Sequence, residues 1–422
     1  MKKLIISSLV CVIFICALAV PQCFCLNEIV FVCDNKEFTY SVDKNIKKSR
    51  NFYEEFELNK YNRFGTTAQK KELLIRMLQL GFDKDVIIEY LYPNISKTIE
   101  KIERTINVKE RDATLSTNSN TKDVFLIAPH VVGKMVNRWQ IYEDLVQRIL
   151  NDQELCVNVK TNKIIPHVVT EDYQKYTHLR ADFSTSIASS SADRKHNVKN
   201  ALNSLNFVEV LPSETFSFNE CVGRRTTENG YRQAKIIVGD EFIDGLGGGV
   251  CQVSTTLYNT ALLSGLEIVE ANKHSKQIAY VKHGFDAMVN FGSSDLKFKN
   301  NTNQKITIVT NYTSNSIRIR IFGEDMGDTS YALKNEILNV VEPQEIIKFD
   351  EQCEYTDKVI YEDESFYLKR ASKGMDVKSY RECYKNGELI KKELLRTDKF
   401  KVQDAIKIYG SKKRPQQDAC VA

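Results

Sequence analysis

Apolar residues recur at helical spacing in the N-terminal part of the chain. This spacing predicts helices over residues 71–80 and 85–92, and Pro93 ends the second of them. A further helix is expected over residues 138–151. Its continuous apolar face is formed by Trp139, Tyr142, Leu145, Val146, Ile149 and Leu150.

Runs of extended character separate and follow these helices. The strands expected in the N-terminal part cover residues 31–32, 38–42 and 124–127, and the polar stretch 112–121 is expected to be a loop. The strands expected beyond residue 340 cover residues 359–361, 366–369, 378–384, 389–395 and 405–409. Asn386-Gly387 lies between two of these and is typical of a tight hairpin turn. The whole pattern predicts an α+β multidomain protein, with a mixed α/β N-terminal domain and a small all-β C-terminal module.

A glycine run followed by the start of a helix stands out in the middle of the chain. Residues 245–259 read Gly-Leu-Gly-Gly-Gly-Val-Cys-Gln-Val-Ser-Thr-Thr-Leu-Tyr-Asn, and the helical pattern continues to Gly265, where a helix can end. Cys251 is therefore expected in the first turn of a helix, where unpaired N–H groups and the helix dipole favour a thiolate. The glycines before it allow close approach of a ligand and offer N–H donors for an oxyanion.

Cys251 is the candidate nucleophile, and such a cysteine needs a base and a group that orients the base. His274 is the preferred base among the six histidines, because an expected strand over 266–270 returns the chain from the helix end toward its start. His283 is the alternative base, one expected strand (277–282) further on, and Asp286 is expected to orient the imidazole.

Backbone and amide groups next to Cys251 complete the expected site. The residues expected to bind substrate and hold the oxyanion are Gly247, Gly248, Gly249 and Gln252. Each candidate also has a plainer interpretation. Cys251 would then be a buried core thiol, the histidines structural side chains, Asp286 a turn cap, and the glycines only a tight turn.

Further ordered motifs extend from about residue 183 to about residue 323. They are Phe-Ser-Phe-Asn (216–219), Gly-Tyr-Arg-Gln-Ala (230–234), Gly-Gly-Gly-Val-Cys-Gln-Val-Ser-Thr-Thr-Leu-Tyr-Asn (247–259), Gly-Leu-Glu-Ile-Val-Glu (265–270), His-Ser (274–275), Gly-Phe-Asp-Ala (284–287) and Asp-Leu-Lys-Phe-Lys-Asn-Asn-Thr (295–302). Their order and spacing resemble the VanW domain of bacterial cell-envelope proteins. Ser213, Ala271 and His283 depart from the usual pattern of that domain.

The resemblance implies a function at the bacterial cell wall, because some VanW-domain proteins behave as L,D-transpeptidases. It implies that Cys251 forms a thioester with a peptidoglycan stem peptide while His274 carries protons, and that no metal or other cofactor is needed. Two alternatives stay open. One is a non-enzymatic peptidoglycan-binding or scaffolding protein associated with glycopeptide resistance, and the other is a hydrolase that uses water as the acceptor.

Both flanks resemble modules that accompany VanW domains. The segment from Asp112-Ala113 to the helix at 138–151 resembles a peptidoglycan-binding repeat, and Ser372-Lys-Gly with Asn386-Gly387-Glu and 408–412 resembles a G-five module, which implies glycan contact. The domain organisation expected from these resemblances is a signal peptide or membrane anchor over 1–25, a peptidoglycan-binding domain over 26–180, a VanW domain over 181–325, a G-five-like β module over 340–412 and a tail over 413–422.

The N-terminus and the charge bear on location and partners. Lys2 and Lys3 precede an apolar stretch over 4–20, which fits either a cleaved export signal or a retained anchor. Both place the rest of the chain outside the cytoplasm, in the wall or anchored to the membrane and facing outward. The net charge of +4 is too small to indicate a nucleic-acid partner.

Cysteine usage limits the covalent and metal chemistry. Of the 11 cysteines, four lie in the first 25 residues, and the odd number left means that at least one has no partner within the chain. Cys353 and Cys383 are candidates for a bridge between facing strands. The cysteines and histidines show no zinc-binding spacing, so no metal site is expected.

Overall fold

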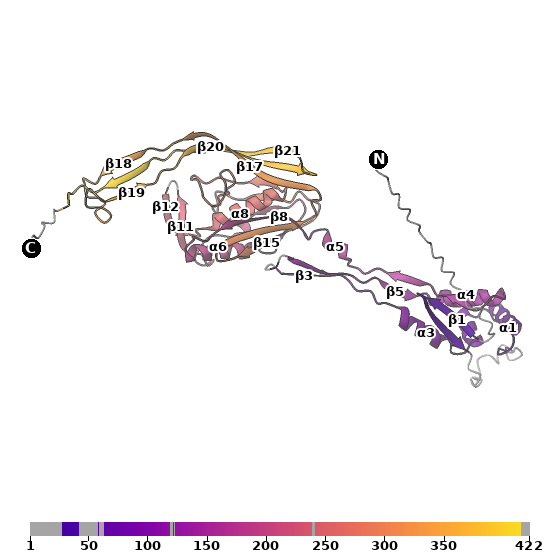
Figure 1. The fold of residues 1–422 in the computed structure, drawn as a ribbon. Helices are drawn as coiled ribbons and strands as arrows, with labels where there is room; N and C mark the ends of the chain where they lie inside the picture. Colours follow the sequence, from indigo (N-terminus) through magenta and orange to yellow (C-terminus); the bar gives the residue numbers. More distant parts are fainter. Residues whose placement is uncertain are drawn as a thin grey trace, which may run out of the picture. The chain divides into compact units, whose positions relative to one another are not determined.

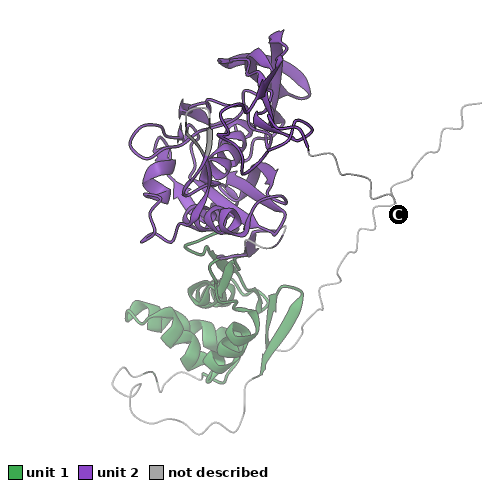
Figure 2. Cartoon of the chain, turned by 90° about the vertical axis from the view of Figure 1, so that its left-hand side faces the viewer, with its two compact units in different colours: residues 1–113, 129–169 green, residues 114–128, 170–422 purple. Residues whose placement is uncertain are grey.

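A computed structural model describes residues 28–41, 58, 63–118, 121, 123–238 and 241–414 (Figure 1). The expected N-terminal export segment, Cys420 and all but two residues of the expected tail lie outside these ranges. The described chain is an α+β protein that divides into two compact units, residues 1–113 with 129–169 and residues 114–128 with 170–422 (Figure 2). None of the described helices is long and apolar enough to cross a membrane.

The first unit packs four helices around a small sheet. Its helices are α1 (Thr67–Gln79), α2 (Lys84–Leu91), α3 (Ile95–Ile106) and α4 (Arg138–Leu150). Its sheet has the order β2-β1-β6, and its strands are β1 (Glu28–Cys33), β2 (Lys36–Ser41) and β6 (Cys156–Asn158), with β5 (Gly133–Val136) and β7 (Thr161–Ile164) forming a separate pair. These elements share one apolar core that includes Phe31, Leu74 and Leu145. The helices predicted from apolar spacing are therefore present at nearly the expected positions.

One stretch of the N-terminal part differs from its sequence-based expectation. Residues 112–121 were expected to form a loop, yet they contain β3 (Thr114–Thr117), which pairs antiparallel with β4 (Phe125–Ala128). The two strands form a ribbon whose residues are mostly exposed or half-buried. A strand that buries neither face needs no apolar alternation, so its polar composition gave no strand signal.

The second unit is built around a four-stranded antiparallel sheet of order β8-β16-β15-β9. The strands are β8 (His178–Ser186), β9 (Val208–Val210), β15 (Ile306–Tyr312) and β16 (Ser316–Gly323). Buried isoleucines of β15 and β16 share a core with α6 (Ala192–Leu205) and α8 (Val250–Leu263). The other elements of this region are α5 (Thr170–Gln174), β10 (Thr215–Ser217), α7 (Phe218–Val222), β11 (Gln233–Val238), β12 (Glu241–Leu246), β13 (Glu267–Glu270) and β14 (Lys297–Lys299).

The C-terminal part of this unit consists of two further sheets. The first has the order β17-β20-β21, from β17 (Thr329–Val341), β20 (Gly374–Lys385) and β21 (Glu388–Phe400), and its strands run past α8 in Figure 1. The second has the order β18-β22-β19, from β18 (Glu345–Phe349), β19 (Ser365–Lys369) and β22 (Ala405–Tyr409). Asn386 and Gly387 both have positive φ, 52° and 80°, as the predicted hairpin turn between β20 and β21 requires. Residues 359–361 contribute only an isolated bridge, through Tyr361, rather than the expected strand.

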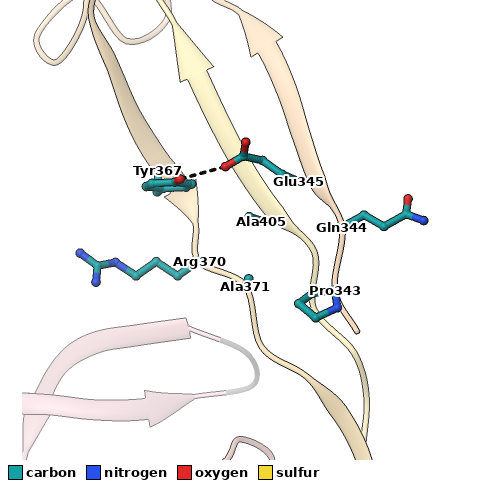
Figure 3. A pocket seen from close by; sticks show the side chains of 7 residues that line it. All are labelled: Pro343, Gln344, Glu345, Tyr367, Arg370, Ala371 and Ala405. Atoms are coloured by element: carbon teal, nitrogen blue, oxygen red, sulfur yellow. Dashed lines mark hydrogen bonds between the residues drawn. The ribbon is translucent and has the colours of Figure 1, made fainter. Parts of the chain in front are cut away.

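The second of these sheets carries a shallow pocket of about 370 Å³ (Figure 3). It is lined by Pro343, Gln344, Glu345, Tyr367, Arg370, Ala371 and Ala405. The hydroxyl of Tyr367 donates to the carboxylate of Glu345 at 2.8 Å. The lining contains no cysteine or histidine, so this pocket lacks the nucleophile and base that the sequence points to.

The cysteines are free thiols in the described chain, which corrects one expectation. Cys353 and Cys383 were proposed as a bridge, but both are unpaired. Cys353 lies in the turn that follows β18, whereas Cys383 is within β20 and hydrogen-bonds Tyr331 of β17. Cys353 therefore lies outside the sheet that contains Cys383, and the two residues do not face each other across a strand pair.

Candidate active site

Cys251 is the second residue of α8, as the glycine run predicted. Gly249 caps the helix with φ of 105°, and Gly265 ends it with φ of 74°. The Cys251 sulfur lies 3.4 Å from the carbonyl oxygen of Val289. The thiol therefore occupies the first turn of a helix that is buried along most of its length.

The three glycines before Cys251 are needed because other elements press against the turn. A Cβ on Gly248 would lie 2.8 Å from the backbone carbon of Ala234, and one on Gly247 would lie 2.8 Å from the Cβ of Arg225. A Cβ on Gly249 would lie 2.9 Å from a methyl group of Val198. Side chains larger than hydrogen would push these elements apart.

The backbone N–H groups of this turn adjoin Cys251 in the sequence. The Gly247 N–H donates to the Arg232 carbonyl, and the Val250 and Gln252 N–H groups donate back to Gly247 and Gly249. In the part of the chain that the structure describes, the N–H groups of Gly248, Gly249 and Cys251 have no acceptor. These are the groups that an oxyanion hole at this helix end would use.

His274 and Asp286 are brought together in the interior, beside Cys251. The Oδ2 atom of Asp286 accepts from both the backbone N–H and Nδ1 of His274, each at 2.7 Å. His274 is 5% exposed and Asp286 is 3% exposed. The imidazole also interacts with the Cys251 thiol, and Nε2 is the ring nitrogen that Asp286 leaves free for this interaction. The three side chains form a chain from carboxylate to imidazole to sulfur.

Polar residues along α8 hold the loop that carries Asp286. The Ser254 hydroxyl donates to the Ala287 carbonyl at 2.6 Å, and the Thr255 hydroxyl accepts from the Ala287 N–H at 3.0 Å. The Asn259 amide donates to the Phe285 carbonyl at 2.8 Å. These buried bonds on both sides of residue 286 fix its backbone relative to the helix that carries the thiol.

The interactions within this cluster shift the pKa values of its members. Burial raises the pKa of the Cys251 thiol, but the hydrogen bond and charge of His274 outweigh burial and leave the pKa below its ordinary value. Burial lowers the pKa of His274, yet the bonds to Asp286 and Cys251 raise it to about 9. Burial raises the pKa of Asp286, and His274 and Arg396 together bring it below its ordinary value. A thiolate–imidazolium pair held by a carboxylate is therefore the favoured charge state.

Two arginines and a tyrosine add to the electrostatic surroundings of the sulfur. Arg194 on α6 and Arg225 both interact electrostatically with the Cys251 thiolate, and burial lowers the pKa of each. Tyr280 also faces the thiolate, and burial raises the pKa of its hydroxyl. Tyr280 also lines a cavity of about 560 Å³ that runs along α8 next to Leu263, Phe285 and Leu333.

Two predicted site residues are placed differently. The Gln252 side chain accepts from Arg194 at 2.8 Å and donates to Thr185 and Ser186, so its amide is used to join α8 to its neighbours. The His283 ring lies 6.1 Å from the Phe400 ring, and the imidazole that contacts Cys251 is that of His274.

The segment between the two histidines also departs from expectation. Residues 277–282 were expected to form a strand but are irregular. Tyr280 of this segment interacts with Cys251 and Thr255.

Sequence reasoning missed Arg396. This β21 residue lies 110 positions after Asp286, and its Nη1 donates to the Asp286 carbonyl oxygen at 2.8 Å. Its Nη2 forms an ion pair with Asp286 Oδ1. No local motif marks Arg396, so only the packing of the C-terminal sheet reveals it. In the described ranges, no group of three or more His, Cys, Asp or Glu is placed to hold a metal ion.

Comparison with known proteins agrees with this arrangement of motifs. The family described as "VanW like protein" matches residues 193–322. The chain is 32% identical over 236 residues to the "Uncharacterized protein YoaR" of Bacillus subtilis (strain 168), which covers 56% of this chain and 76% of that protein. The chain belongs to the VanW family.

A second relative and two solved structures also match. The "Vancomycin B-type resistance protein VanW" of Enterococcus faecalis (strain ATCC 700802 / V583) is 27% identical over 154 residues, which are 34% of this chain and 54% of that protein. This VanW-family chain thus spans about half of that relative. An IgA1 protease G5 domain structure is 18% identical, covers 21% of this chain and 98% of its own, and has a TM-score of 0.14. The crystal structure of HP0197-G5 is 18% identical, covers 19% of this chain and 99% of its own, and has a TM-score of 0.11.

Proposed function

We propose that this VanW-family protein is an exported cell-wall protein that catalyses Cys-dependent acyl transfer on peptidoglycan stem peptides, in the manner of an L,D-transpeptidase. The observation that carries the proposal is the buried contact from Asp286 through His274 to Cys251 at the start of α8. A core cysteine with no chemical role does not need an imidazole that is itself held by a carboxylate.

The residues have distinct roles in the proposed reaction. The Cys251 thiolate attacks the carbonyl carbon of the acyl donor, and the negative oxygen of the tetrahedral intermediate is held by the N–H groups of Gly248, Gly249 and Cys251. His274 gives its Nε2 proton to the departing amine, and Cys251 is left as a thioester. An acceptor amine then attacks the thioester and passes its proton to His274, which restores the thiolate–imidazolium pair.

The acyl donor is a stem peptide that loses its terminal D-alanine, and the acceptor is an amine of a neighbouring stem. This assignment comes from the family resemblance. The site itself supports acyl transfer and does not distinguish between amine and water as the acceptor. A hydrolase would use the same residues and release a shortened stem peptide.

Purified muropeptides provide the test. The wild-type chain should convert tetrapeptide monomers to cross-linked dimers, seen by mass spectrometry, and Cys251→Ala should yield none. Free tripeptide without dimer would indicate hydrolysis. No change with the wild type, together with binding to sacculi, would favour the non-enzymatic wall-binding alternative.

We propose that the flanking modules bind the wall, with the first unit as the peptidoglycan-binding part and the C-terminal strands as a G-five-like module. This follows from the resemblances of both flanks. Sedimentation with purified sacculi tests it for the first unit. A chain that begins at residue 170 lacks both segments of the first unit and should be retained less than the full chain. Equal retention would mean that the first unit does something else.

A further inference from the structure

We propose that Arg396 of the C-terminal sheet is a positioning residue for the thiol site, and that the site is incomplete without this sheet. The inference rests on the proposed role of Cys251 as a nucleophile. It concerns a residue outside the segment matched by the VanW family, residues 193–322.

Arg396 contacts both the backbone and the side chain of Asp286. Nη1 donates to the Asp286 carbonyl oxygen at 2.8 Å, and Nη2 pairs with the carboxylate oxygen Oδ1. Nε donates to Asp398 Oδ2 at 2.9 Å. The side chain of Arg396 is 15% exposed, and those of Asp286 and Asp398 are each 4% exposed. One guanidinium therefore bonds two buried carboxylates, which share its single positive charge.

The two oxygens of Asp286 have separate partners. Oδ2 accepts both bonds from His274, whereas Oδ1 pairs with Arg396. Loss of the guanidinium would leave a buried charged oxygen without its cation, which is unfavourable unless the carboxylate rotates or takes up a proton. Either response would weaken the bond that orients His274 toward Cys251.

The C-terminal sheet is fixed to the segment that carries His274 at several other points. Arg381 of β20 donates to the Leu266 carbonyl at 2.6 Å, and Asn335 of β17 donates to the His283 carbonyl at 3.0 Å. Gly284, with φ of 88°, lies so near β20 that a Cβ there would be 2.9 Å from the Cβ of Ser379. These contacts place Arg396 at a defined position over Asp286.

Several other charged or titratable groups face this cluster. Cys251 faces His274, Arg194, Arg225 and Tyr280, and Asp286 faces His274, Arg396, Asp398, Tyr258 and Tyr280. Two cationic groups face Asp286, His274 and Arg396, and Arg396 is the one that the C-terminal sheet supplies. Its removal should therefore change the pH dependence of the thiol through Asp286, beyond any loss of stability.

The experiment measures alkylation of Cys251 by iodoacetamide across pH in the full chain, with peptide-level mass spectrometry to separate this cysteine from the others. Arg396→Gln should lower the rate at neutral pH at least tenfold and move the apparent thiol pKa upward. Arg396→Lys should recover part of the loss, because one cation is kept. Arg381→Gln is the matched control, since Arg381 also joins the sheet to the central part but does not contact Asp286.

A double-mutant cycle decides whether Arg396 acts through Asp286. In an Asp286→Asn background, Arg396→Gln should have little further effect on the alkylation profile. Full additivity, or a profile of Arg396→Gln that matches Arg381→Gln, would overturn the positioning role. If wild-type Cys251 reacts no faster than a free cysteine, the nucleophile proposal fails as well, whereas a fast wild type with an unaffected Arg396→Gln overturns only this inference.

Discussion

Asp286 Oδ2 accepts two hydrogen bonds from His274, one from the backbone N–H and one from Nδ1, both at 2.7 Å. The double contact fixes the position of the imidazole and its tautomer at the same time, because Nδ1 must carry a proton. Nε2 is then the ring nitrogen left free to interact with the Cys251 thiol.

Asp286→Asn should slow acyl transfer by about 10²-fold or more, because the amide cannot stabilise the imidazolium that the reaction uses. The apparent pKa of Cys251 should rise, since a neutral His274 no longer stabilises the thiolate. Alkylation rates across pH measure this change. Asp398→Asn is a useful comparison, because Asp398 shares Arg396 but does not contact His274. An Asp286→Asn variant with wild-type rates would exclude an orienting role.

Alkylation of Cys251 and acyl transfer by Cys251 should differ in their dependence on pH. Alkylation needs only the thiolate, so it should begin below the ordinary thiol pKa and continue at high pH. Acyl transfer also needs the imidazolium proton, and the pKa of His274 is raised to about 9. Transfer should therefore fall as pH rises through about 9 while alkylation does not. Parallel falls of both rates would contradict the assignment of His274 as the proton donor.

Cys251→Ala should abolish transfer and leave the fold intact, because Cys251 is only partly buried and contributes one small side chain to the core. The cost in stability should be about 1 kcal/mol, as for a typical single substitution. Thermal unfolding and muropeptide analysis measure the two effects. Cys221 serves as an internal control, since burial raises its pKa and it should alkylate slowly.

Gly249→Ala should destabilise the protein more than Gly292→Ala, although both glycines have positive φ. The strain of a left-handed residue costs about 1–2 kcal/mol at each position. At Gly249 the new methyl group also meets Val198 and Arg194, which adds about 1–3 kcal/mol, whereas nothing lies within 4 Å at Gly292. Urea unfolding gives the difference, and equal losses would mean that the turn relaxes freely.

In a chain that ends at residue 325, the Cys251 thiol should lose its high reactivity. In a chain that ends at residue 403, it should remain reactive. The longer chain retains β17, β20 and β21, and with them Arg396. Both chains lack β22, the central strand of the β18-β22-β19 sheet. The comparison therefore separates the role of the β17-β20-β21 sheet from that of the β18-β22-β19 sheet. Iodoacetamide labelling of Cys251 is the measurement. Equal labelling would show that the central part holds Asp286 without help.

The sequence identified the parts of the site that lie close together in the chain. The glycine run, the helix after it, and His274 and Asp286 within 35 positions of Cys251 all belong to one local succession of elements. Periodicity also located α1, α2 and α4, because each buries a continuous apolar face.

Contacts between segments that are far apart in the chain could not be predicted from the sequence. Arg396 is one of many basic residues in β20 and β21, and alternation alone does not show which one faces Asp286. The contacts of the polar side chains on α8 also depend on packing between distant segments. Ser254, Thr255 and Asn259 are buried against the loop that carries Asp286.

The ion pair between Arg396 and Asp286 also bears on how such chains can diversify. A boundary near residue 325 looks like a natural place for recombination to exchange one C-terminal module for another. Because the guanidinium reaches back across that boundary, a foreign module could fold correctly and still leave Asp286 without its cation. A new C-terminal module would need an arginine that reaches Asp286 as Arg396 does. The VanW domain and its C-terminal module are therefore expected to be inherited together.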